Sequence, residues 1–138
     1  MKVILAILVL AGSCVGSQKT PPADLRNTRW VLKELQGKPV VIPEGGREAF
    51  ILFAPDDTKV SGMGSCNNFF GTAAISEKTI SFSGIGATRM ACPDMRVEDA
   101  LFQILSAPVT YSIAGRTMVW EQNGRVVVRL KALDDIGK

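Results

Sequence analysis

Three cysteines and 13 acidic residues are the first candidates for chemistry in this 138-residue chain, which contains no histidine. Serine and cysteine nucleophiles activated by histidine, histidine-ligated zinc and a histidine general base all need an imidazole ring. Any catalysis would have to use carboxylates, lysine, tyrosine or cysteine. The chemistry open to this chain is therefore narrow.

The acidic residues do not form a catalytic pattern in the sequence. Asp56 and Asp57 follow a proline in a segment typical of a turn. Glu98 and Asp99 lie in a predicted helix, where the helix dipole favours acids near the N-terminus, and we place both on its solvated face. A carboxylate enzyme is the least favoured function. We predict no enzymatic activity, no cofactor and no metal site.

The first 13 residues are typical of a signal peptide. Lys2 supplies a positive charge, and residues 3–11 form an apolar run that is far shorter than the ~20 residues needed to span a bilayer. The alternative is a buried N-terminal strand. Residues 10–14, with the sequence LAGSC, resemble a bacterial lipobox, in which the cysteine is acylated and becomes the new N-terminus. Ordinary cleavage after Ser13 or Ser17 is the alternative to acylation of Cys14.

Acylation of Cys14 would attach the protein to a membrane without a transmembrane helix, because each buried CH2 contributes about 0.8 kcal/mol. Val15 rather than aspartate follows the cysteine, which favours the outer membrane, with the domain facing the periplasm. Residues 14–23 contain glycine, serine and two prolines, and we expect a lipid-anchored tether. The folded domain would then span residues 24–138.

Cys66 and Cys92 remain as an even pair if Cys14 carries lipid. In an oxidising envelope we predict that they form a structural disulfide, for which the chain-entropy account gives roughly 3 to 4 kcal/mol. The alternative is a redox-active pair. It is disfavoured because the chain has no Cys-x-x-Cys spacing and no histidine to lower a thiol pKa.

Short apolar runs alternate with turn residues, which is typical of antiparallel strands. Strands are expected over residues 30–36, 49–54, 59–63, 69–75, 79–83, 109–113, 117–122 and 125–131. Gly37 and Pro39 end the first strand, and Asn123-Gly124 predicts a type I′ hairpin turn. The fold class is α+β: a small antiparallel, partly open β-barrel or strongly curved sheet with one amphipathic helix packed on it.

The helix is predicted after Pro93, with Asp94 as its cap and Pro108 beyond its end. Apolar residues recur at helical spacing at Val97, Ala100, Leu101, Ile104 and Leu105. Glu98, Asp99 and Gln103 are expected on the opposite face.

A net charge of +3, with both signs scattered, excludes nucleic acid as the expected partner. Arg125, Arg129 and Lys131 alternate with apolar residues in the last strand, so we expect a solvated face. An anionic membrane surface is the alternative use for them.

Two segments resemble the signatures of the META domain family. Residues 61–71 carry Gly62, Cys66, Asn67, Phe69 and Gly71, and residues 87–92 carry Thr88, Arg89, Met90 and Cys92. The resemblance extends over residues 24–133. It implies a partly open β-barrel with a packed helix, an envelope location, links to heat stress and to novobiocin tolerance, and no accepted activity or cofactor.

Two kinds of function are compatible with the export signal, the predicted disulfide and this resemblance. The first is a lipoprotein, joined to the membrane by its acyl anchor, that binds a protein partner or an apolar ligand. The second is an envelope inhibitor or interaction module acting on a hydrolase or on a secretion or assembly component.

The residues of the two segments also have direct interpretations. Gly62, Gly64 and Gly71 permit tight turns or bulges. Asn67 and Asn68 tolerate left-handed conformations and are expected to bond to nearby backbone. Arg89 either satisfies loop carbonyls or a carboxylate, or presents its charge to an anionic ligand.

Overall fold

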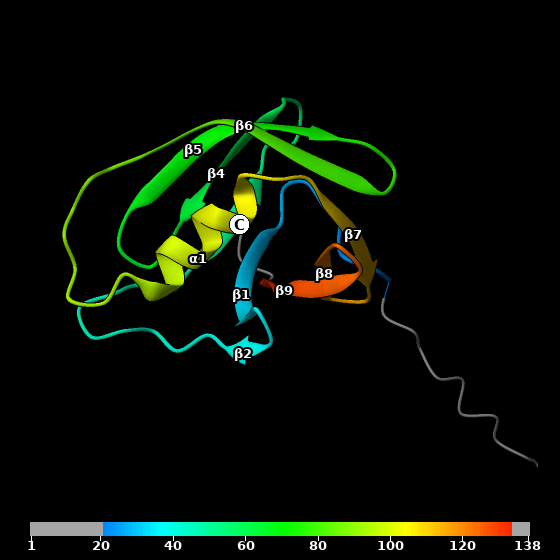
Figure 1. Ribbon diagram of the computed structural model, residues 1–138. Helices are drawn as coiled ribbons and strands as arrows, with labels where there is room; N and C mark the ends of the chain where they lie inside the picture. The colour runs from blue at the N-terminus through cyan, green and yellow to red at the C-terminus, as the bar shows by residue number, and fades with distance from the viewer. Residues whose placement is uncertain (1–20, 134–138) are drawn as a thin grey trace, which may run out of the picture.

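An antiparallel sheet that closes on itself holds a single helix in the computed structural model, which describes residues 21–133 (Figure 1). The strands are β1 (Arg29–Leu35), β2 (Lys38–Pro39), β3 (Phe50–Phe53), β4 (Lys59–Met63), β5 (Asn68–Ile75), β6 (Thr79–Ala87), β7 (Val109–Ala114), β8 (Thr117–Gln122) and β9 (Arg125–Leu133), and the helix is α1 (Arg96–Leu105). The predicted signal peptide, Cys14 and the first part of the predicted tether lie outside the described residues.

The sheet runs in the order β2-β1-β3-β4-β5-β6-β7-β8-β9, and β1 closes the ring by also pairing with β9. The ring is weakest between β6 and β7, which pair only at Thr79 with Thr110 and at Ile80 with Val109. α1 contacts both β1 and β6, which are not neighbours in the sheet. The predicted α+β fold, a partly open barrel with one packed helix, is confirmed.

The barrel interior is filled mainly by aromatic and branched side chains. Trp30 and Trp120 are fully buried, and the indole nitrogen of Trp30 donates a hydrogen bond to the Leu25 carbonyl at 3.0 Å. Phe102 of α1 packs edge-to-face on Phe69 of β5, with ring centroids 5.7 Å apart. Leu101, Ile104 and Leu105 of α1 are buried in the same core. Each fully buried large apolar side chain contributes about 1.5 to 3 kcal/mol, so these leucine and isoleucine side chains attach the helix to the barrel.

The predicted strands are present, with two differences. β6 continues to Ala87 rather than ending at residue 83, because a register shift opposite Phe70 and Thr72, with Gly84 at φ +59°, bends the strand without ending it. Gln36 and Gly37, with φ of 51° and 76°, form a tight turn after β1. Leu35 therefore pairs with Lys38, and Pro39 belongs to a short strand, β2, that the sequence did not predict.

The Asn123-Gly124 turn is confirmed, since both residues have positive φ, at 52° and 73°. The predicted cap of α1 is wrong in position: Met95 precedes the helix, and its side chain makes no cap bond. Asp94 instead accepts a hydrogen bond from the Arg96 backbone N–H at 3.0 Å. Of the predicted tether, Ala23 already contacts the fold, where its N–H donates to the Gly115 carbonyl at 2.8 Å.

α1 has 10 residues and is the helix found in residues 21–133. No helix in that part of the chain is long and apolar enough to cross a membrane.

Candidate functional site

The carboxyl group of Glu98 is buried beneath the loop that joins β4 to β5. The side chain is 2% exposed. Its Oε2 accepts hydrogen bonds from the backbone N–H groups of Cys66 and Asn67, at 3.0 and 2.6 Å, and its Oε1 accepts one from the Asn67 side-chain amide at 2.7 Å. The expectation of a solvated Glu98 is therefore wrong, whereas Asp99 and Gln103 are exposed as predicted.

The sequence carried a signal for this burial. Glu98 lies three residues before Leu101 and seven before Leu105, so a helix places all three on one face. Both leucines are buried. The position of Glu98 on the helix, rather than its chemical type, therefore decides its burial.

The loop around residues 64–67 approaches the Glu98 carboxyl group closely. A Cβ atom at Gly64 would lie 2.7 Å from the Glu98 carboxyl oxygen, so only glycine fits there. At Gly62 a Cβ would meet the Phe69 ring and the Phe50 carbonyl. Close packing rather than turn geometry explains these two glycines, whereas Gly71 lies at a bulge as predicted. The left-handed residue in this loop is Ser65, with φ 108°, and not Asn67 or Asn68.

The Asn67 side chain connects this loop to the loop after β6. Its Oδ1 accepts hydrogen bonds from the Thr88 hydroxyl at 2.9 Å and from the Met90 N–H at 2.7 Å. Its amide nitrogen donates to the Met90 carbonyl at 3.1 Å as well as to Glu98. The side-chain hydrogen bonds of Asn67 thus reach residues more than 20 positions away rather than its near neighbours.

The predicted disulfide between Cys66 and Cys92 is present, with the Cα atoms 6.0 Å apart. It joins the same two loops that Asn67 connects. We call Glu98, Asn67, Thr88 and the disulfide the clasp. Four of the nine predicted motif residues therefore meet at the clasp and hold the two loops together: Cys66, Asn67, Thr88 and Cys92.

Two motif side chains point away from the clasp. Met90 is 56% exposed, although its backbone is fixed at both N–H and C=O by Asn67. Arg89 is exposed, and its guanidinium has no hydrogen bond or ion pair within residues 21–133. This contradicts the interpretation that Arg89 satisfies loop carbonyls or a carboxylate. Presenting its charge to an anionic ligand stays a prediction.

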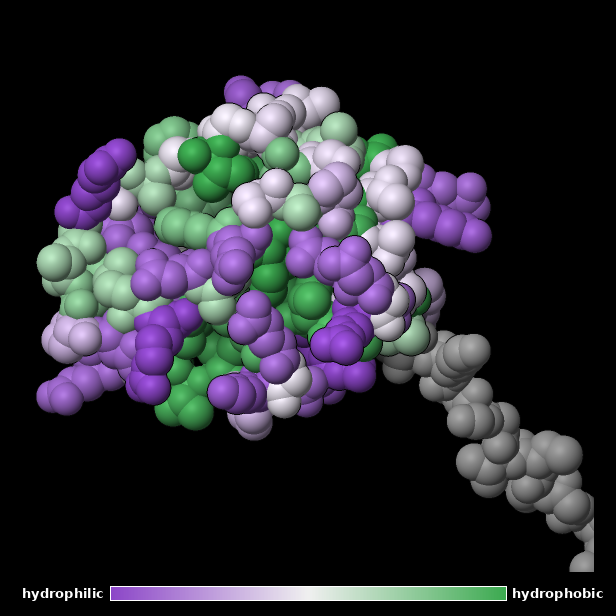
Figure 2. All heavy atoms as spheres, viewed as in Figure 1, coloured by the Kyte–Doolittle hydropathy of each residue, from purple (hydrophilic) through white to green (hydrophobic). Residues whose placement is uncertain are grey.

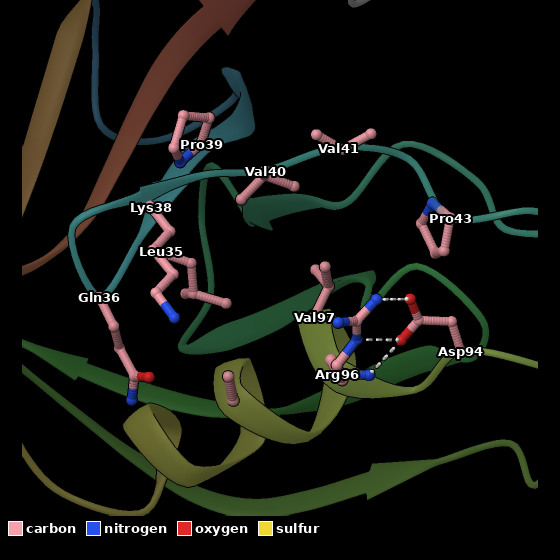
Figure 3. Close-up of a pocket in the computed structure, with 11 residues that line it drawn as sticks. Leu35, Gln36, Lys38, Pro39, Val40, Val41, Pro43, Asp94, Arg96 and Val97 are labelled. Atoms are coloured by element: carbon pink, nitrogen blue, oxygen red, sulfur yellow. Dashed lines mark hydrogen bonds and ion pairs between the residues drawn. The ribbon is translucent and has the colours of Figure 1, made fainter.

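A surface groove of about 410 Å³ lies between α1 and the segment that contains β2 (Figure 3). Pockets that bind small molecules are mostly ~300–1,000 Å³. The groove is lined by Leu35, Gln36, Lys38, Pro39, Val40, Val41, Pro43, Asp94, Arg96, Val97 and Ala100. Val41 is 74% exposed, and the adjacent Ile42 is 53% exposed. In Figure 2, apolar surface lies between charged side chains at the lower left of the molecule.

The acid and the guanidinium in the groove satisfy each other. Arg96 Nε and Nη2 donate to the two carboxyl oxygens of Asp94, at 3.0 and 2.7 Å. These side-chain hydrogen bonds, followed by the bond from the Arg96 backbone N–H, lower the pKa of Asp94 from 3.8 to about 2. Lys38 points from β2 toward α1 in Figure 3 and has no ion pair among the described residues.

A second hollow, of about 240 Å³, lies between β6 and α1. Its lining residues are Ile85, Gly86, Ala87, Phe102, Leu105 and Ser106. It is smaller and has no charged side chain in its lining, so the groove beside β2 is the stronger binding candidate.

This fold and these linked loops define a META-type barrel, and the sequence comparison agrees: the META domain matches residues 23–134, so the chain belongs to the META domain family. A relative is heat shock protein HslJ of Escherichia coli strain K12, 30% identical over 97 residues, which are 69% of this chain. The match spans 66% of HslJ, just under two thirds of its length.

Two solved structures share the fold. An NMR structure of a protein from Burkholderia xenovorans has a TM-score of 0.64 at 22% identity, covering 80% of this chain and 85% of that one. A second NMR structure has a TM-score of 0.63, also at 22% identity, covering 78% of this chain and 90% of the other. At this identity the similarity establishes the fold alone.

Replacing Glu98 tests the clasp. In Glu98→Gln an amide NH2 would face N–H donors, and at least one buried donor would lose its acceptor. We expect the free energy of unfolding, measured by urea denaturation of the oxidised protein, to fall by about 2 to 4 kcal/mol. The control Asp99→Asn, on the exposed neighbour, should stay within about 0.5 kcal/mol of the parent. An equal loss of unfolding free energy in both variants would contradict the stabilising role of Glu98 in the clasp.

Removing the guanidinium partner tests the electrostatics of the groove. The Asp94 carboxyl carbon, followed by NMR, should titrate with a pKa of about 2 in the parent protein. In Arg96→Gln the pKa should rise toward 3.8. Because the folded-state pKa is depressed, any stability from this pair is present above pH ~4 and is lost as the pH falls toward 2. An unchanged pKa in Arg96→Gln would show that Arg96 is not the cause.

Proposed function

We propose that this chain is a non-enzymatic lipoprotein of the bacterial envelope whose META domain binds an apolar ligand in the groove between α1 and β2. The groove is the observation that carries the proposal. Its lining includes Leu35, Val40, Val97 and Ala100, and two exposed apolar residues lie at its edge. Monomeric proteins rarely leave contiguous apolar surface uncovered unless it binds something.

The absence of enzymatic activity is supported by what the reactive side chains already do. Glu98 is buried with three hydrogen bonds, and Cys66 and Cys92 are joined to each other. A general acid or nucleophile must reach a substrate. The Glu98 carboxylate contacts loop N–H groups and the two cysteines are bonded to each other, so binding suits the geometry better than turnover.

Membrane attachment through Cys14 completes the proposal. Ala23 is nine residues beyond Cys14 in the sequence. A fully extended chain of nine residues reaches about 30 Å. An acylated Cys14 would thus keep the domain close to the outer membrane, on the periplasmic side. The name of the relative HslJ refers to heat shock, and we propose a role for this chain under heat or antibiotic stress.

Filling the groove tests the binding site. Addition of 1-decanol should shift the backbone amide signals of Lys38, Val40 and Val41 and of residues 97–100 in an NMR spectrum. Ala100→Phe places a ring in the groove and should abolish these shifts, whereas the control Ala74→Phe, at an exposed position on β5, should retain them. Shifts confined to Ile85 and Phe102 would assign binding to the second hollow and contradict the proposed site.

Mass spectrometry tests the anchor. The protein purified from membranes should begin at Cys14 and carry the added mass of acyl chains, and Cys14→Ser should release it into the soluble periplasmic fraction. A mature N-terminus at an unmodified Cys14, or at Gln18, would overturn lipidation while leaving the groove proposal standing.

A further inference from the structure

The charge of the groove is set by Lys38. Three charged side chains line the groove, and two of them, Asp94 and Arg96, form a two-bond ion pair. Opposite charges that satisfy each other leave no net charge to attract a ligand. Lys38 therefore supplies the net positive charge of the lining.

Local structure explains why Lys38 faces the groove. The tight turn at Gln36 and Gly37 brings β2 back against β1, so that Lys38 pairs with Leu35. Leu35 is buried and lines the groove. Figure 3 shows the Lys38 side chain extending toward α1. Its aliphatic stem can lie along apolar surface while the ammonium group remains available, as lysine commonly does.

We propose that the groove selects a single-chain amphiphile with an anionic head group, a carboxylate or a phosphate. The chain would lie over Val40, Val97 and Ala100, with the head group against the Lys38 ammonium group. This inference rests on the proposed function that the groove binds an apolar ligand, and it adds the chemical class of that ligand.

The size and charge of the groove both fit this class. A volume of about 410 Å³ is near the lower end of the ~300–1,000 Å³ range of ligand pockets, which suits one chain better than two. The ammonium group is a compact charge that binds an anion without the planar geometry that a guanidinium requires. Because the groove is open to solvent, screening limits the preference for an anion to about three- to tenfold in Kd.

The test compares ten-carbon ligands that differ only in the head group. The chain carrying Cys14→Ser is used, so that no acyl chain of its own competes, and ligands are kept below their micelle-forming concentrations. Decanoate and decyl phosphate should bind about three- to tenfold more tightly than 1-decanol, and decyltrimethylammonium should bind more weakly than 1-decanol. The ratio between decanoate and decyl phosphate identifies which head group is preferred.

Variants of Lys38 separate charge from packing. Lys38→Met should bring decanoate to the affinity of 1-decanol, and Lys38→Glu should make decyltrimethylammonium the tightest ligand. Lys131→Met, which removes an exposed lysine of β9, should behave as the parent.

Equal binding of decanoate and 1-decanol to the parent, or a preference that survives in Lys38→Met, would overturn the inference and leave the proposed function intact. If no ligand binds, 1-decanol included, both are overturned. Retained binding of 1-decanol by Lys38→Met shows that this variant is folded.

Discussion

One buried carboxyl group constrains the half of the barrel on which α1 packs. Taking a carboxyl group out of water is costly unless its oxygens accept hydrogen bonds, and Glu98 meets this requirement only where the N–H groups of Cys66 and Asn67 point inward. The loop must therefore adopt one shape, with glycine at position 64 and a left-handed Ser65. A shift of α1 along its axis would break all three bonds at once. The position of the helix and the shape of the loop are thus fixed together.

The same constraint reaches the groove through the chain. Asp94 and Arg96 lie between Cys92, which is held by the disulfide, and Glu98, which is held by the loop. The start of α1 is consequently fixed on both sides, and so is the wall of the groove that it forms. The opposite wall comes from the hairpin of β1 and β2, whose register is set by the Gln36-Gly37 turn. A groove with rigid walls loses less entropy when it binds a ligand.

The sequence predicted what local patterns determine. Alternating residues located the strands, Asn123-Gly124 located its turn, and cysteine parity paired Cys66 with Cys92. It did not predict Glu98, because the fate of a buried acid depends on donors that come from more than 30 residues away. The groove could not be predicted from the sequence either, because its two walls come together only when α1 packs beside β2. Contacts between distant segments have no short-range signature in the sequence.

The two connections between the loops act on different states of the chain. The disulfide acts mainly on the unfolded chain, whose freedom it restricts. The hydrogen bonds of Glu98 and Asn67 exist only in the folded chain, where they satisfy groups that would otherwise be buried without partners. Because β6 and β7 share only two residue pairs, the sheet itself contributes little closure on this side. On this side α1 packs on both β1 and β6, and the clasp holds α1 in place through Glu98.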